Sequence, residues 1–214
     1  MQVLLGLDLE PIVAPGVLMF EEVRVLDHDD RMDPPIADTE ARVRAAVDLN
    51  SDISQVRTMY KRLGIDPTKV RPSSEALLRR VRKGEPLPRI NSLVDICNWC
   101  SLETQLPYGL YNLDRIEGDT VTLRVGLDGE GYEGIRKDRV NVEGRITLAD
   151  AVGPFGNPTS DSARTMVTVE TTRVLFLIYC PREHAAHALD KALALTASRM
   201  LEFSGGRETQ RLTL

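Results

Sequence analysis

The feature that most constrains the fold is a change in sequence texture near Asp114. Before this residue, two apolar strand-like segments are followed by several segments with helical periodicity; after it, short β-type segments alternate with glycine. The last apolar segment, residues 174–179, is followed by Pro181, which opens a long predicted helix. Because helices and strands are grouped and do not alternate regularly, the sequence predicts an α+β fold and not a fold wound from βαβ units.

Two spacing patterns predict the individual elements. Strands are expected where apolar residues alternate or run together: residues 3–9, 16–25, 120–125, 140–142, 145–148, 165–169 and 174–179. Helices are expected where apolar residues recur every three or four positions: residues 39–49, 53–63, 75–81, 92–102 and 181–203. Residues 107–112 are predicted to be a compact connection, and residues 207–214 a tail or a last strand.

Composition narrows the class of protein. The 214 residues are 42% hydrophobic and 28% charged, which predicts a globular domain with a packed core. The longest apolar run, residues 174–180, is far too short to span a bilayer, and the N-terminus lacks the basic start of a signal peptide. With only three cysteines, these features predict a cytoplasmic protein with no membrane partner.

The charge balance limits nucleic-acid binding. The net charge is −5 and the pI is about 5.3, which argues against broad binding driven by many phosphate contacts. A local basic surface is still compatible with this balance, and one run of the sequence could form it: Arg71, Arg79, Arg80, Arg82 and Lys83. The alternative interpretation of this run is an ordinary solvated helix face.

Residues 129–134 match the dinucleotide-binding pattern G-x-G-x-x-G. That site needs a strand before it, and a helix after it whose N-terminus faces the pyrophosphate. Here Glu130 and Glu133 put negative charge where phosphate would lie, and no helix is expected to follow. The segment is therefore predicted to be a glycine-rich connection between strands, and no cofactor is predicted.

Metal binding has two candidate sequences. A zinc site would need Cys97 and Cys100 together with ligands from Cys180, His184 and His187, but free cysteines are also common core residues. His28 lies among Asp27, Asp29 and Asp30, which could bind a cation or form an acidic loop. Neither has a standard metal-ligand spacing, so no metal site is predicted.

Three stretches together resemble one family: residues 71–80, 91–114 and 149–175. In order and spacing they resemble the B3/4 domain of the phenylalanyl-tRNA synthetase beta subunit, and most closely its free-standing relatives. The resemblance implies a single domain over residues 1–214, with a mixed sheet flanked by helices and a long C-terminal helix. Residues 64–206 would form its core and 207–214 a tail, while residues 1–63 would complete the fold or form a small cap.

The resemblance also implies an activity. In the synthetase, this module hydrolyses the ester that joins a wrongly attached tyrosine to the phenylalanine tRNA. Such a site needs a side-chain pocket, donors for the carbonyl oxygen and an oriented water. A strong nucleophile is not required, because an aminoacyl ester is already activated. The implied partner is a tRNA 3′ end or an aminoacyl-tRNA, bound through a weak, local contact.

The resemblance implies binding residues around the helix at 92–102. Asn91, Asp95 and Asn98 fall on one helical face, which suits a polar pocket wall; the alternative is that Asn91 caps the helix and Asp95 makes a structural hydrogen bond. Tyr108 and Gly109 follow this helix. The synthetase has a histidine at the position of Gly109, so this side chain is missing here, which puts catalysis in question.

The loop over residues 153–165 holds the remaining implied site residues. A glutamate of the synthetase recognises the tyrosine hydroxyl, and Asp161 is its approximate equivalent. Asp161, Ser160 and Thr159 are the candidate catalytic residues; the candidate substrate-binding residues of this loop are Asn157, Ser162, Arg164 and Thr165. Arg164 could hold a carboxylate or phosphate with its planar guanidinium. Alternatively, Asx and Ser turns make this an ordinary solvated loop.

Three functions remain open from the sequence. The first is a tRNA-associated domain that hydrolyses mischarged aminoacyl-tRNA in trans. The second is a non-catalytic protein that binds a free amino acid, a related small metabolite or RNA. The third is a zinc-supported interaction domain. The oligomeric state is not predicted.

Overall fold

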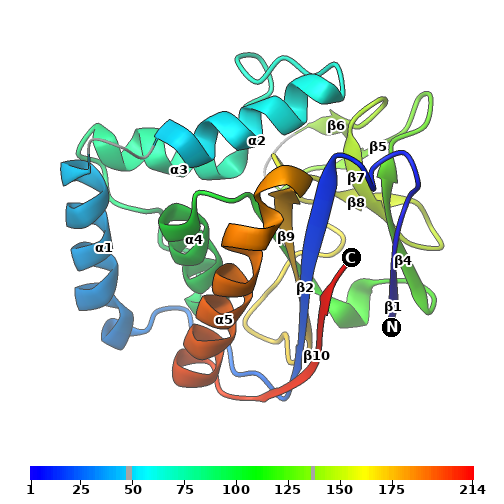
Figure 1. Ribbon diagram of the computed structural model, residues 1–214. Helices are drawn as coiled ribbons and strands as arrows, with labels where there is room; N and C mark the ends of the chain where they lie inside the picture. Colours follow the sequence, from blue (N-terminus) through cyan, green and yellow to red (C-terminus); the bar gives the residue numbers. More distant parts are fainter. Residues whose placement is uncertain (47–49, 136–137) are drawn as a thin grey trace.

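The computed structural model describes residues 1–46, 50–135 and 138–214, and over these residues the fold is α+β, as predicted (Figure 1). The described helices are α1 Asp33–Ala45, α2 Asn50–Arg62, α3 Ser73–Arg82, α4 Ser92–Thr104 and α5 Ala185–Phe203. One four-stranded sheet has the order β1 Gln2–Leu5, β4 Thr120–Val125, β7 Ile146–Ala149 and β8 Pro154–Gly156. The other has the order β10 Arg207–Thr213, β2 Val13–Glu21, β9 Val174–Pro181 and β3 Tyr108–Asn112. Strands β5 Gly131–Glu133 and β6 Arg139–Asn141 form a separate pair.

Strand β9 is the centre of the fold. All eight of its residues are buried, and it pairs antiparallel with β2 on one side and β3 on the other. A continuous apolar run is what a strand covered on both faces requires. Figure 1 shows α4 and α5 on one side of this sheet and the β1–β4–β7–β8 sheet on the other. Among the helices of the described residues, none is long and apolar enough to cross a bilayer.

Helix α4 is fixed at both ends and along one side. The Asn91 side chain accepts a hydrogen bond from the Val94 N–H at its N-terminus, and Gln105 adopts a left-handed conformation at its C-terminus. The Trp99 indole N–H donates to the Thr39 hydroxyl of α1 at 2.8 Å, and the Arg199 guanidinium of α5 lies 3.5 Å from its ring centroid. These contacts bind three helices into one layer.

Three predicted elements are wrong. Residues 129–134 were expected to be a connection between strands, but residues 131–133 form β5, which pairs with β6. Residues 107–112 were expected to be a connection, but residues 108–112 form β3, because tertiary pairing with β9 outweighs the local turn signal of Pro107 and Gly109. Residues 165–169 were expected to be a strand, but they form none. There the Thr171 hydroxyl accepts from the Thr168 N–H at 2.9 Å, so a local turn forms in place of hydrogen-bonded pairing with another strand.

The ends of the chain contribute to both large sheets. Strand β1 pairs parallel with β4, and β2 lies between β9 and β10. The N-terminal strands are therefore part of the sheets and not a separate cap. Helix α1 begins earlier than predicted, since Pro34 and Pro35 suit a first helical turn, and it ends at Ala45; residues 47–49 of the predicted helix lie outside the described residues.

The two large sheets meet at the Tyr111 side chain. A Cβ atom added to Gly109 of β3 would lie 2.2 Å from the Tyr111 hydroxyl oxygen, and one added to Gly156 of β8 would lie at the same distance. The Tyr111 ring also packs edge-on against Phe155, with 5.0 Å between centroids. The phenol thus fits between two backbone positions that only glycine leaves open.

A buried ion pair fixes the loop between β7 and β8 and the segment that follows. The side chain of Asp150 is fully buried and accepts from both terminal nitrogens of Arg164, at 2.8 and 3.0 Å. Burial by itself raises the pKa of Asp150, but hydrogen bonds from Arg164 and from the Glu117 N–H outweigh it and hold the pKa below its ordinary value. This differs from the predicted ligand-binding role of Arg164, because its guanidinium is already occupied.

Replacing Gly109 tests the contact between the sheets. We expect Gly109→Ala to lower the free energy of unfolding by about 1–3 kcal/mol, since the new methyl group collides with a buried ring. In a Tyr111→Ala background the same substitution should cost much less, and urea denaturation of the four proteins measures this coupling. Equal costs in both backgrounds would contradict the packing described above.

Removing Arg164 tests the ion pair. Arg164→Ala should cost about 3 kcal/mol at pH 7, because it leaves a buried carboxylate unpaired. The folded-state pKa of Asp150 is depressed, so its stabilisation exists above the unfolded value of about 3.9 and is lost as the pH falls. The difference from the parent protein should therefore narrow in urea titrations below about pH 4. Arg115→Ala, which removes an exposed arginine nearby, is the matched control and should behave like the parent.

Candidate functional site

A pocket of about 160 Å³ lies between α3, α4, β3 and the segment that follows β8. Its polar lining residues are Ser73, Cys97, Asn98, Ser101, Tyr108 and Asp161. The rest of the lining is apolar, with Leu77, Met166 and Val167 among its members. An apolar wall with a few convergent polar groups is typical of a small-ligand site.

Helix α4 presents one face to this pocket: Val94, Cys97, Asn98 and Ser101. Asn91 and Asp95, which were predicted to share a pocket-facing surface with Asn98, do not line it. Asn91 caps the helix, and Asp95 accepts hydrogen bonds from Arg89 Nε at 2.7 Å and from the Ile90 N–H at 2.8 Å. The structural alternative therefore describes these two residues, and Asn98 alone of the three lines the pocket.

Asp161 is held by a chain of buried hydroxyl groups. The Tyr111 hydroxyl donates to Oδ1 of Asp161 at 2.8 Å and lies 3.1 Å from the Tyr179 hydroxyl of the neighbouring strand β9. Burial, together with the nearby carboxylate, raises the pKa of both phenols well above the ordinary value. Both tyrosines therefore remain protonated at neutral pH. Tyr111 was not identified from the sequence, although it lies two residues beyond Gly109.

The position of Gly109 explains why it carries no side chain. The Tyr111 phenol fills the space into which a residue at position 109 would project. Any histidine there would collide with this ring. The chain thus places a hydroxyl group beside Asp161 where the resemblance implies an imidazole.

One buried polar group in the pocket has no hydrogen-bond partner among the described residues. The Ser73 hydroxyl oxygen is buried and makes no hydrogen bond, whereas the Asn98 side chain lines the pocket and is only partly buried. In the structure Pro72 is the N-cap of α3, so the Ser73 hydroxyl is not used for capping. Buried polar groups without partners are rare, and a ligand is one way to satisfy them.

The predicted catalytic residues Ser160 and Thr159 lie apart from this pocket, together with Asn157. The Asn157 side-chain oxygen accepts from the Thr159 and Ser160 N–H groups at 2.8 and 2.9 Å, which forms a local turn. The Thr159 hydroxyl lies 3.0 Å from the hydroxyl of Tyr60, and the Ser160 carbonyl accepts from Tyr132. Asn157 and Thr159 line a separate cavity of about 10 Å³, which holds no more than a water.

The other predicted binding residues have structural partners or lie outside the pocket. Ser162 accepts from the Arg164 N–H at 3.1 Å and lines an outer groove. Thr165 is fully buried and its hydroxyl has no partner, but it does not line the pocket. Tyr108 lines the pocket, and its hydroxyl lies 3.2 Å from that of Thr196. The pocket thus brings together Asn98, Tyr108 and Asp161 of the predicted set.

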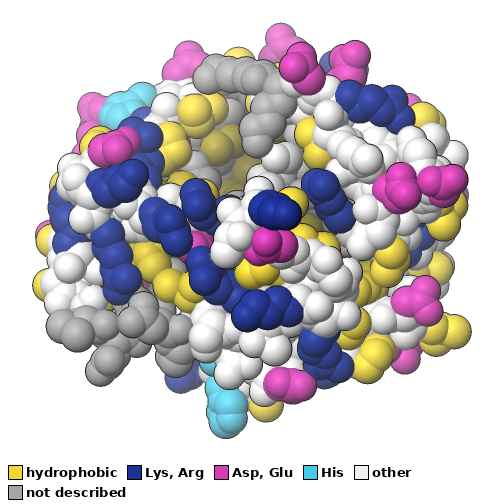
Figure 2. Space-filling model, turned by 90° about the horizontal axis from the view of Figure 1, so that it is seen from above, with side chains coloured by type: hydrophobic (Ala, Val, Ile, Leu, Met, Phe, Trp, Pro, Cys, Tyr) yellow, Lys and Arg dark blue, Asp and Glu magenta, His cyan; other side chains and the backbone are white. Residues whose placement is uncertain are grey.

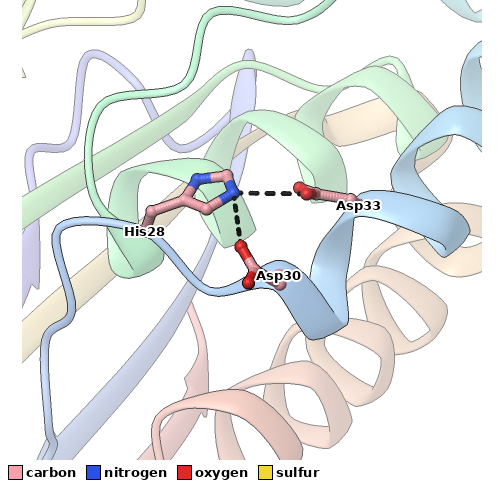
Figure 3. Close-up of side chains that lie close together, drawn as sticks. All are labelled: His28, Asp30 and Asp33. Atoms are coloured by element: carbon pink, nitrogen blue, oxygen red, sulfur yellow. Dashed lines mark hydrogen bonds and ion pairs between the residues drawn. The ribbon is translucent and has the colours of Figure 1, made fainter.

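The cysteines do not assemble the zinc site that was considered. Burial, with a further contribution from Asp161, raises the pKa of the Cys97 thiol well above its ordinary value, so it is neutral at physiological pH. Within the described part of the chain, the one group with metal-ligand proximity is His28, Asp30 and Asp33 (Figure 3). His28 Nε2 lies 3.1 Å from Asp30 and 3.2 Å from Asp33, all three are exposed, and Asp33 also pairs with Arg89. These contacts describe a surface ion-pair cluster.

Comparisons with known proteins identify a family for this chain. The family model described as the B3/4 domain matches residues 55–206. The phenylalanine–tRNA ligase beta subunit of Symbiobacterium thermophilum is 30% identical over 113 residues, which are 52% of this chain and 13% of that protein. The fold is similar to the crystal structure of an N-terminal fragment of the phenylalanyl-tRNA synthetase beta subunit from Pyrococcus horikoshii, with a TM-score of 0.50 and 13% identity over 99% of this chain and 53% of that one.

The chain thus spans only a small part of the curated relative and about half of the solved fragment. The resemblance expected from residues 71–80, 91–114 and 149–175 is confirmed by the family match, which covers them all. Since that match extends over well more than half of its residues, this chain belongs to the B3/4 domain family.

Proposed function

We propose that this B3/4 domain binds the aminoacyl end of a tRNA in the pocket at Asp161 and hydrolyses its ester bond in trans, in the cytoplasm. One observation carries the proposal: the Asp161 carboxylate shares a small, largely apolar pocket with the buried, unpartnered Ser73 hydroxyl and the Asn98 side chain. The names of both relatives refer to a ligase or synthetase of phenylalanine and tRNA, which supports this class of ligand.

The proposed chemistry is a single water attack. Asp161 orients a water and accepts its proton as the water oxygen bonds to the ester carbonyl carbon. Asn98 and Ser73 donate hydrogen bonds to the carbonyl oxygen as negative charge develops there. The bond between the carbonyl carbon and the ribose oxygen then breaks, the ribose oxygen takes up the proton, and the free amino acid leaves. Tyr111 acts as a positioning residue, since its hydroxyl holds the carboxylate.

The size of the pocket supports an aminoacyl group as the ligand. A volume of about 160 Å³ corresponds to about five water molecules, which suits an amino-acid side chain but not a nucleotide. The nucleic acid would therefore stay outside, and only the esterified amino acid would enter. Apolar neighbours such as Leu77 and Met166 favour an uncharged side chain.

A second function, binding of a free amino acid without hydrolysis, is favoured by the site around Gly109. A protonated phenol stands where the resemblance implies a histidine, and it cannot act as a base at neutral pH. Calorimetric titration with free amino acids distinguishes the two functions. Binding without turnover of any aminoacyl-tRNA supports this alternative, whereas turnover supports the hydrolase.

Substitution of Asp161 tests the hydrolase. Asp161→Asn should lower the deacylation rate by about 100-fold or more, because it removes the group that accepts the proton. The assay follows release of amino acid from correctly and wrongly charged tRNAs, starting with tyrosine on the phenylalanine tRNA. Thr159→Ala lies outside the pocket and should keep the parent rate. An Asp161→Asn variant with the parent rate on the hydrolysed substrate would place the chemistry elsewhere.

Substitution of Tyr111 tests the positioning role. Tyr111→Phe keeps the ring between the two glycines and removes the hydroxyl that donates to Asp161. A carboxylate without this donor is more easily protonated, so the acid limb of the rate–pH profile should move to higher pH. A purely structural role would lower the rate equally at all pH values. Deacylation measured between pH 4 and 8 separates the two outcomes.

A further inference from the structure

The charge of the chain is divided unevenly. Residues 53–83 contain nine basic and two acidic residues, a formal charge of +7 in a chain whose net charge is −5. The remaining residues therefore carry −12. This segment comprises most of α2, all of α3 and the turn between them. Figure 2, which views the molecule from the side of α2 and α3, shows Lys and Arg side chains gathered across this face.

The formal charge of +7 already subtracts the two acidic residues of the segment, and both have fixed partners. Asp66 accepts from the Thr68 N–H and hydroxyl in a local turn. Glu75 is buried, with 4% of its side chain exposed, and accepts from Arg57 Nη2 at 2.7 Å and Arg79 Nε at 3.0 Å. The hydrogen bond from Arg57 is the main reason that the pKa of Glu75 lies below its ordinary value, although burial acts in the opposite direction. Glu75 thus fixes the arginines in place and leaves the surface basic.

Three of the arginines, Arg57, Arg79 and Arg82, border a groove of about 330 Å³ between α2 and α3. Arg71 lies just before α3 and two residues from Ser73; its Nε atom makes no hydrogen bond but lies 3.8 Å from the Glu75 carboxylate as an ion pair. Ser73 and Leu77 of the same helix line the pocket that contains Asp161. The basic groove and the pocket therefore share α3 as a common wall.

We propose that this α2–α3 surface, defined by Arg71, Arg79 and Arg82, binds the phosphate backbone of an RNA whose 3′ end enters the pocket. This inference rests on the proposed function, because it assigns the binding of the RNA to a face next to the site. Guanidinium groups held in fixed positions match phosphate oxygens with paired hydrogen bonds. The −12 charge of the other residues repels RNA elsewhere and orients it toward this face.

A charge-neutralised variant tests this surface. The triple variant Arg71→Gln, Arg79→Gln, Arg82→Gln keeps Arg57, so Glu75 retains its hydrogen bonds from that side chain. The matched control is Arg24→Gln, Lys191→Gln, Arg207→Gln, which makes the same charge change on exposed residues of β10, of α5 and after β2. Circular dichroism and thermal melting establish that both variants are folded.

The probe is a fluorescently labelled, uncharged tRNA transcript, with anisotropy measured from 50 to 300 mM KCl. We expect the triple variant to bind at least tenfold more weakly at 50 mM, and its slope of log affinity against log salt to be smaller by about 2. The control should match the parent. A triple variant with the parent's affinity and slope overturns the inference, as does a parent protein that binds anionic lipid vesicles through these arginines but not tRNA.

Hydrolysis of an aminoacyl ester of adenosine, which lacks an RNA backbone, is measured in parallel. If the parent hydrolyses it and the triple variant binds tRNA like the parent, the inference fails while the proposed function stands. If no protein hydrolyses any ester but the triple variant loses tRNA binding, the proposed function fails while the inference stands. Loss of tRNA binding with unchanged ester hydrolysis supports both.

Discussion

The candidate site depends on one packed side chain, the phenol of Tyr111. It fits between Gly109 and Gly156, which belong to different sheets, and its hydroxyl donates to Asp161. A single residue thus joins the two sheets and fixes the acidic group of the pocket. Because the ring is rigid and buried, the position of Asp161 is tied to the packing of the core. Asp161 therefore keeps its position as long as the contact between the two sheets is intact.

The polar residues near the site fall into two groups according to their partners. Asn157, Asp150 and Arg164 satisfy one another or the backbone, and so hold the segment that carries Asp161. The buried Ser73 hydroxyl lacks a hydrogen-bond partner among the described residues and lines the pocket. A buried donor without a partner loses free energy unless a ligand or water satisfies it, whereas a satisfied group gains little from a ligand. This difference separates structural residues from candidate binding residues.

Helix α3 carries residues of both the pocket and the basic surface. The N-terminal part of α3 contributes Ser73 to the pocket, and Arg79 and Arg82 further along contribute to the basic groove. Glu75 lies between these positions and binds arginines from both α2 and α3. A protein with a negative net charge can in this way keep one basic face. The buried Glu75 carboxylate holds the arginines in position, and the acidic residues elsewhere repel RNA from other surfaces.

The sequence by itself determined the α+β class, the main helices, the central strand at 174–179 and the family, because these depend on local periodicity and on residues that follow one another in order. It also identified Asp161 and Asn98 as candidates. Only the tertiary structure decided that β3 is a strand, that Arg164 is occupied by Asp150, and that Tyr111 takes the space beside Gly109. Each of these depends on a partner at least 14 residues away or on packing between sheets, and local sequence patterns carry no information about such partners.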